Sequence, residues 1–198
     1  MFKNIVHNFQ SLWWVFILFT VALVIGLSLY AQRVAAAGAS HYSILAETIQ
    51  PLDSTIGFNN TSAYLVTTAG STVNAGTQYV AQVNLPDGAV ISDVRVYGID
   101  SDTVKNIGAG MYRYNQDNTP VYSSVTNFVP SSGNPGKTVL NLPMTSVAAA
   151  TIDNLTYSYS VFIDLPRATE LNTTTPNLGI LRIIIDWSYP TYVPLISR

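Results

Sequence analysis

The chain has 198 residues with 9 Lys and Arg against 11 Asp and Glu, which gives a formal net charge of −2, and it contains no cysteine. This composition excludes disulfides, cysteine-bound zinc, a thiol nucleophile and the basic surface that nucleic-acid binding needs. Charged residues make up 10% of the sequence, less than half of the roughly 25% usual in soluble domains. A hydrophobic segment, a weakly charged domain surface, or both, are therefore expected.

A hydrophobic segment lies near the N-terminus. No charged residue occurs between Lys3 and Arg33, and residues 12–30 are almost wholly apolar. As a helix this stretch would be about 28 Å long, which matches a hydrocarbon core of about 30 Å. Aromatic residues at both ends suit the headgroup regions. We predict a cytoplasmic tip and transmembrane helix over residues 1–31. The residues expected to anchor it in the lipid bilayer are Leu12, Trp13, Trp14, Phe16, Leu23, Leu29 and Tyr30.

The competing interpretation is a cleaved secretory signal, because Ala35 and Ala37 precede Gly38 in an A-x-A-like pattern. The apolar run exceeds the roughly 7 to 15 residues usual in such signals, and Arg33 separates it from the cleavage site. We therefore favour an uncleaved anchor. The downstream chain lacks cysteine and is rich in Thr, Ser and Asn, so we predict a single-pass membrane protein with a cytoplasmic N-terminus and a periplasmic or extracellular C-terminal domain.

Residues 32–43 are predicted to form a stalk or linker, and residues 44–189 a strand-rich domain. Short runs in which apolar and polar residues alternate, broken by Gly, Pro, Asn and Asp, are typical of antiparallel strands. The fold class expected is all-β, an antiparallel β-sandwich or jelly roll. The last strand contains Ile183, Ile184 and Ile185 in succession, which suggests burial on both faces. The strands expected cover residues 55–58, 63–67, 79–85, 90–99, 107–114, 121–125, 138–142, 157–164 and 179–189.

A resemblance covers about residues 77–189. Residues 83–91 read Val-Asn-Leu-Pro-Asp-Gly-Ala-Val-Ile, followed by Val94, Val96, Tyr97 and Asp100, and a later Tyr-Ser-Tyr strand precedes the aliphatic strand over residues 178–189. This pattern resembles secreted or surface bacterial β-sandwich proteins of unassigned function. The resemblance implies a fold and an envelope location, and it carries no activity or cofactor.

The sequence offers no catalytic constellation. His7 precedes the hydrophobic segment and His41 falls in the predicted stalk, so no histidine is expected within the β-domain to serve as a general base. Asp100 and Asp102 form a weak calcium candidate, with an ordinary turn as the favoured alternative. Asp186 is interpreted as one half of a structural ion pair, with Arg167 or Arg182 as its partner, or as a residue at an exposed edge position. We expect no enzyme activity, cofactor or metal.

Tyrosine is the one enriched carrier of polar and aromatic groups, with 12 in the chain. Tyr112, Tyr114 and Tyr122 cluster around one expected hairpin, and tyrosine faces can bind sugars or partner proteins. The apolar C-terminal tail, residues 190–198, contributes Tyr192, Leu195 and Ile196 as further partner-binding candidates. The leading hypothesis is a non-catalytic, membrane-anchored envelope protein acting as a structural or accessory subunit of a larger assembly. The alternative is a surface lectin or adhesin that binds glycans or proteins through the tyrosine-rich face.

Overall fold

The structure is a computed structural model that describes Thr20 and residues 39–60, 64–69, 77–117, 121–131, 136–167 and 177–190. Residues 39–190 form one compact unit, and residues 1–38 with 191–198 belong to a second. Among the described residues, no helix has both the length and the apolar character needed to cross a bilayer. Apart from Thr20, the expected membrane span over residues 12–30 lies outside the described residues, so the anchor stays a prediction.

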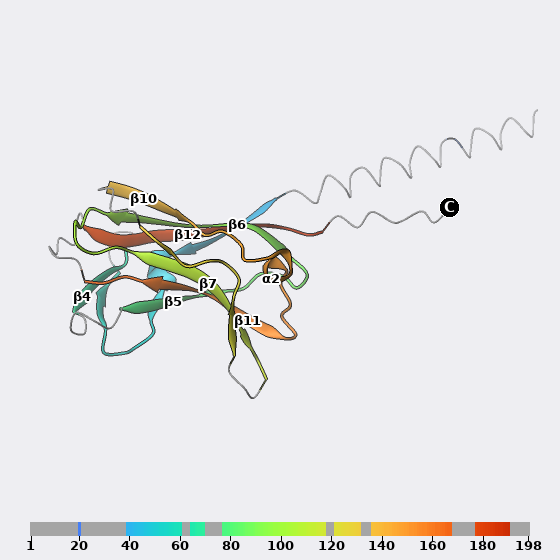
Figure 1. Ribbon diagram of the computed structural model, residues 1–198, viewed down its shortest axis with the longest axis horizontal. Coiled ribbons are helices and arrows are strands. Elements are labelled where there is room, and N and C mark those ends of the chain that lie inside the picture. The colour runs from blue at the N-terminus through green and yellow to red at the C-terminus, as the bar shows by residue number, and fades with distance from the viewer. Residues whose placement is uncertain are drawn as a thin grey trace, which may run out of the picture. The chain divides into compact units, whose positions relative to one another are not determined.

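The unit 39–190 contains two antiparallel sheets that form two layers (Figure 1). The four-stranded sheet has the order β1 (Ser40–Leu45), β12 (Leu178–Ser188), β6 (Val90–Asp100) and β10 (Gly136–Asn141). The six-stranded sheet has the order β2 (Gln50–Pro51), β5 (Gln78–Val83), β11 (Tyr157–Asp164), β7 (Gly108–Asn115) and β8 (Tyr122–Ser124), with β9 (Val129–Pro130) also paired to β7. A small sheet pairs β3 (Gly57–Asn59) with β4 (Val66–Ala69), and the described helices are the short η1 (Ala46–Thr48) and α2 (Val147–Ala150). The all-β antiparallel prediction is confirmed.

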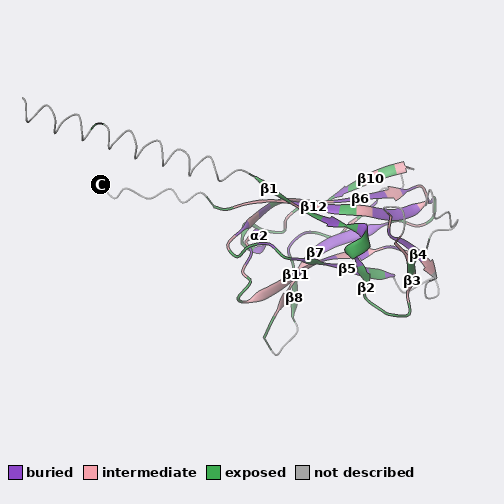
Figure 2. Ribbon diagram, turned by 180° about the vertical axis from the view of Figure 1, so that it is seen from behind, coloured by how far each residue is buried: buried purple, intermediate pink, exposed green. Residues whose placement is uncertain are grey.

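The two large sheets share one hydrophobic core, and the alternation of side chains along each strand explains why. In β11, Tyr159, Val161 and Ile163 are buried, whereas the residues between them are half-exposed. These three belong to the same buried cluster as Val94 and Ile183 of the four-stranded sheet. Figure 2 shows buried residues along the central strands of both layers. Each sheet therefore keeps one face for the core and presents the other outward.

The prediction that the last strand is buried on both faces is wrong. Ile183 and Ile185 of β12 are fully buried, but Ile184 is half-exposed on the outer face of the four-stranded sheet. The physical reason is the two-layer architecture, in which no further layer of described residues covers that face. Three successive isoleucines alternate like any other residues, and the middle one faces outward.

The predicted boundary between stalk and domain is also wrong, because residues 40–43 belong to β1. Ser40 pairs with Trp187, and the pairing continues to Leu45 opposite Arg182. Tyr42 packs against the core and Ile44 is buried within it, while His41, Ser43 and Leu45 are exposed. The edge of β12 supplies the hydrogen-bonding partner that turns this polar stretch into a strand. His41, expected in the stalk, therefore lies in a sheet.

Strand pairing defines two opposite ends of the sandwich. Ser40 and Ser188 lie at one end, which we call the chain-terminal end, and both lead to the boundaries of the unit at residues 39 and 190. Asp164 pairs with Gln78 and Gly108 at the other end, which we call the distal end. The short connections from β5 to β6 and from β6 to β7 keep these ends aligned in the two sheets. The chain thus enters and leaves the unit at the end opposite Asp164.

Candidate functional site

The outer face of the six-stranded sheet carries a line of aromatic side chains. Tyr112 and Tyr114 are two residues apart on β7, so both project from the same face. Tyr114 pairs directly with Tyr122 on β8, and Phe162 on β11 pairs with Gly110. The alternation that buries Val161 and Ile163 in the core directs Phe162 outward.

Tyr112, Tyr114, Tyr122 and Phe162 form a closed set of ring contacts, which we call the aromatic quartet. Tyr112 lies edge-on to Tyr122 and to Phe162, with centroid separations of 5.9 and 5.6 Å. Tyr114 is tilted against the same two rings, at 6.2 and 5.9 Å. These separations lie within the range in which aromatic pairs attract one another. The quartet is therefore held together by its own contacts before any ligand arrives.

Two glycines on β7 create the space in which rings lie against the sheet. A Cβ added to Gly108 would overlap the ring of Phe128, whose Cε1 would be only 2.7 Å away. A Cβ added to Gly110 would lie 3.2 Å from Cε2 of Tyr112. Phe128 comes from the link between β8 and β9, and its ring occupies the place of the missing Gly108 side chain. Glycine is used here for close packing within a strand.

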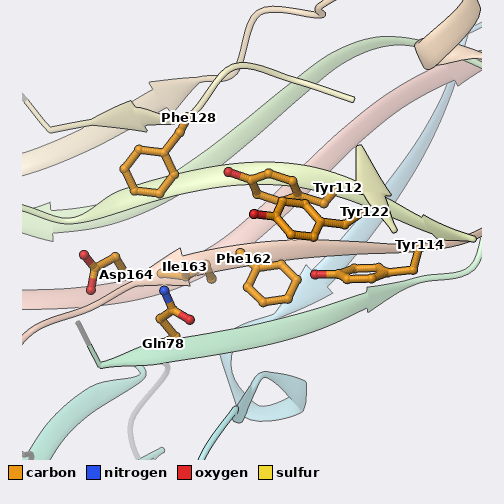
Figure 3. A pocket seen from close by; sticks show the side chains of 8 residues that line it. All are labelled: Gln78, Tyr112, Tyr114, Tyr122, Phe128, Phe162, Ile163 and Asp164. Carbon is orange, nitrogen blue, oxygen red and sulfur yellow. The ribbon is translucent and has the colours of Figure 1, made fainter. Parts of the chain in front are cut away.

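A pocket of about 300 Å³ lies over this face (Figure 3). Its walls consist of the aromatic quartet and Phe128, together with Gln78, Ile163 and Asp164. In Figure 3 the three tyrosine hydroxyls point along the sheet toward the side of the pocket that holds Gln78 and Asp164. The pocket therefore combines aromatic surfaces with hydroxyl, amide and carboxylate groups that converge on one side.

Burial raises the pKa of Tyr112 and of Tyr114, and the neighbouring tyrosines raise it further. Both phenols consequently keep their protons at neutral pH and can donate as well as accept hydrogen bonds. Burial also raises the pKa of the Asp164 carboxyl. Oδ1 of this carboxyl is shielded from solvent and has no hydrogen-bond partner among the described residues.

The structure brings together three of the partner-binding candidates, because Tyr112, Tyr114 and Tyr122 all line the pocket. The candidates from the tail, Tyr192, Leu195 and Ile196, lie outside the described residues. Sequence analysis missed the other five lining residues, Gln78, Phe128, Phe162, Ile163 and Asp164. The alternation of β11 placed Phe162 and Asp164 on one face, but nothing in the sequence paired that strand with β7.

Asp100 and Asp102, the weak calcium candidate, are both buried near the distal end. Oδ2 of Asp100 accepts a hydrogen bond from the Ser131 hydroxyl. Oδ1 of Asp102 accepts from the backbone N–H groups of Val104 and Lys105, at 2.9 and 3.1 Å, which is the geometry of an Asx turn. No group of three or more His, Asp or Glu side chains suited to a metal ion occurs among the residues that the structure describes.

A second polar cluster lies on the outer face of the four-stranded sheet. Asp186 contacts His41, with 2.6 Å between Oδ1 and Nδ1, and also forms an ion pair with Arg95. Arg95 Nε lies 2.9 Å from Asp93 Oδ2. Asp186 forms an ion pair, as expected, but its partner is Arg95 and not the predicted Arg167 or Arg182. Pairing of β12 with β6, which the sequence does not reveal, places Ile184 opposite Arg95 and Asp186 opposite Asp93, and so brings Arg95 within reach of Asp186.

Comparison of the sequence with protein-family models gives no match, and neither does comparison with curated proteins. Among solved structures, the chain is similar to a xylan-binding module CBM15, with a TM-score of 0.44 and 10% identity over 77% of this chain and 99% of that one. It is also similar to a chain of infectious bursal disease virus Gx strain, with a TM-score of 0.33 and 10% identity, covering 79% of this chain and 35% of the viral one. The site is therefore interpreted from its own geometry.

Proposed function

We propose that this protein is a non-catalytic, membrane-anchored surface protein whose β-sandwich binds glycans through the aromatic pocket. The observation that carries the proposal is the aromatic quartet beside converging polar groups. Aromatic faces pack well against the C–H surfaces of sugar rings, and Tyr adds a hydroxyl at low entropic cost. Gln78 and Asp164 offer an amide and a carboxylate to the sugar hydroxyls. The hydrophobic N-terminal segment, as predicted from sequence, would hold the domain at the membrane.

The size and accessibility of the pocket fit this role. Ligand pockets commonly measure about 300–1,000 Å³, so a volume of about 300 Å³ suits a short stretch of a sugar chain. Tyr122 is 65% exposed and Phe128 49% exposed, so a ligand can reach the surface of both rings. The preformed contacts within the quartet reduce the entropy that binding must remove.

The experiment is a glycan array probed with the full chain in mild detergent. The variant Tyr112→Ala with Tyr122→Ala removes two of the four quartet rings, and we expect its affinity to fall at least tenfold, which corresponds to about 1.4 kcal/mol. The matched control is Tyr189→Ala, because Tyr189 is also exposed but its ring contacts Trp187, away from the pocket. Thermal melting checks that both variants fold. A blank array, or an equal loss in the control, would contradict glycan binding.

The structural or accessory-subunit role is the second candidate, and exposed apolar side chains beside the pocket favour it. Val121 is 59% exposed next to Tyr122, and a partner protein could cover both. In this case other chains should co-purify with the full chain in mild detergent and be lost in the Tyr122→Ala variant. A chain that runs alone as a monomer would contradict the role.

A further inference from the structure

Asp164 is the one charged side chain among the described residues that line the pocket, and no Lys, Arg or His accompanies it there. It lies on the outer face of β11, half-buried, with Oδ1 shielded from solvent. A carboxylate in such a place normally accepts several hydrogen bonds or pairs with a cation. The pocket therefore contains an acceptor whose partner is not supplied by its described neighbours.

The neighbours of Asp164 on both flanking strands explain why it has no partner. Gly108 on β7 carries no side chain, and Gln78 on β5 donates no hydrogen bond to Oδ1 of Asp164. The ammonium of Lys105, in the connection from β6 to β7, donates to the backbone carbonyl of Arg167, at 2.6 Å. Burial raises the pKa of the Asp164 carboxyl, and no described cation or hydrogen bond acts in the other direction.

An aromatic ring lies close to the same carboxylate. The ring of Phe128 lies over Gly108, the residue that pairs directly with Asp164. Phe162 precedes Asp164 by two residues on the same face, but its ring leans toward Tyr114, away from the carboxylate (Figure 3). The face of an aromatic ring attracts a cation, and this attraction strengthens where water is excluded. An ammonium group here would meet the carboxylate and the Phe128 ring together, whereas a neutral hydroxyl would gain one hydrogen bond.

We propose that the pocket selects glycans carrying a free amino group, with the protonated amine held between Asp164 and the ring of Phe128. This inference rests on the glycan binding proposed above and names the ligand class. Charge complementarity supports this selectivity, because the described residues that line the pocket supply one negative charge and no positive charge. The aromatic quartet would then hold the neighbouring sugar rings along the sheet.

The test uses three β-1,4-linked hexasaccharides that differ only at carbon 2 of each sugar: a glucosamine hexamer with an ammonium, an N-acetylglucosamine hexamer with a neutral amide, and a glucose hexamer with a hydroxyl. Calorimetric titration of the full chain in mild detergent, at a pH where the amine is protonated, should show at least tenfold tighter binding of the glucosamine hexamer. Asp164→Asn should remove this preference and leave the affinity for the neutral hexamers within about twofold. The matched control, Asp117→Asn, removes an equal charge from an exposed site outside the pocket and should keep the preference.

Each outcome has one meaning. If the neutral hexamers bind and the glucosamine hexamer binds no more tightly, the selectivity is overturned and glycan binding stands. If the preference survives in Asp164→Asn, or is lost equally in Asp117→Asn, it comes from overall charge and the inference fails. If none of the three hexamers binds, both proposals are overturned. Thermal melting of each variant ensures that a lost preference reflects the site and not unfolding.

Discussion

Gly108 and Gly98 show that the same residue type serves the site in one place and the core in another. Both lie in strands where a side chain would collide with a neighbour. At Gly108 the obstacle is the ring of Phe128, a half-exposed side chain that can swing away. At Gly98 the obstacle is the backbone carbonyl oxygen of Gly179, which would lie 2.7 Å from the new Cβ. The two positions therefore separate an effect on the pocket from an effect on stability.

Gly108→Ala should displace Phe128 and weaken glycan binding severalfold, while the free energy of unfolding changes by less than about 1 kcal/mol. Gly98→Ala should cost about 1–3 kcal/mol, because overpacking against backbone forces the strands apart. Its affinity should be unchanged under conditions where it remains folded. Urea unfolding and calorimetric titration measure the two quantities. Full affinity in Gly108→Ala would show that Phe128 has no part in the site.

At the same scale, sequence reasoning finds residue types but not their neighbours. Tyr112, Tyr114 and Tyr122 could be grouped in advance because they flank one turn, so their proximity is local. Phe162 and Asp164 reach the same pocket only through pairing of β11 with β7 across more than forty residues of chain. An outward Phe in an alternating strand was the available signal, and it has no meaning until the neighbouring strand is known.

At the scale of elements, the predicted strands are those that carry enough apolar residues to reveal their period. β5, β6, β7 and β11 each begin and end within about two residues of the prediction. β2 and β9 have two residues each and exist only because of their partners. Residues 40–43 of β1 fall in the predicted stalk because Tyr42, their one inward apolar residue, does not stand out in a polar stretch.

The placement of β1 in the domain can be tested at Ile44. Ile44 is 6% exposed and pairs with Ile183, whereas the adjacent Leu45 is 50% exposed. Ile44→Ala should lower the free energy of unfolding by about 2–4 kcal/mol, since it empties a buried site. Leu45→Ala serves as the control and should cost less than about 0.5 kcal/mol. Equal effects in a denaturant titration of the full chain would mean that residues 40–45 do not pack as a strand of the domain.

At the scale of the whole molecule, the low charge content has two sources. The first 32 residues contribute one charged residue, Lys3. The domain itself places its described ion pairs in one cluster on the four-stranded sheet and keeps the opposite outer face largely uncharged. The domain thus has one charged and one aromatic outer face, a division that depends on which strands pair and is therefore invisible in the composition.

The membrane anchor is the prediction that belongs to this scale. The full chain should remain in the membrane fraction after alkaline carbonate extraction. Phe16→Arg with Leu23→Arg should release it, because each arginine near the centre of a span costs about 2.5–3.5 kcal/mol. Gln10→Arg, which adds a positive charge outside the span, is the control and should stay bound. A measurement of intact mass tests the alternative. A mature N-terminus at Gly38 would identify the segment as a cleaved signal and contradict the anchor.

The pairing of Ser40 with Trp187 also decides how the domain carries mechanical load. Pulling residues 39 and 190 apart would open β1 from β12 one residue pair at a time, beginning at Ser40. If residue 39 is pulled against a ligand held at Asp164, the force acts on opposite ends of the sandwich. The residue pairs between β1 and β12 are then loaded together, in shear. A domain tethered by its N-terminal side and gripping a glycan at its far end would resist tension in its stronger direction.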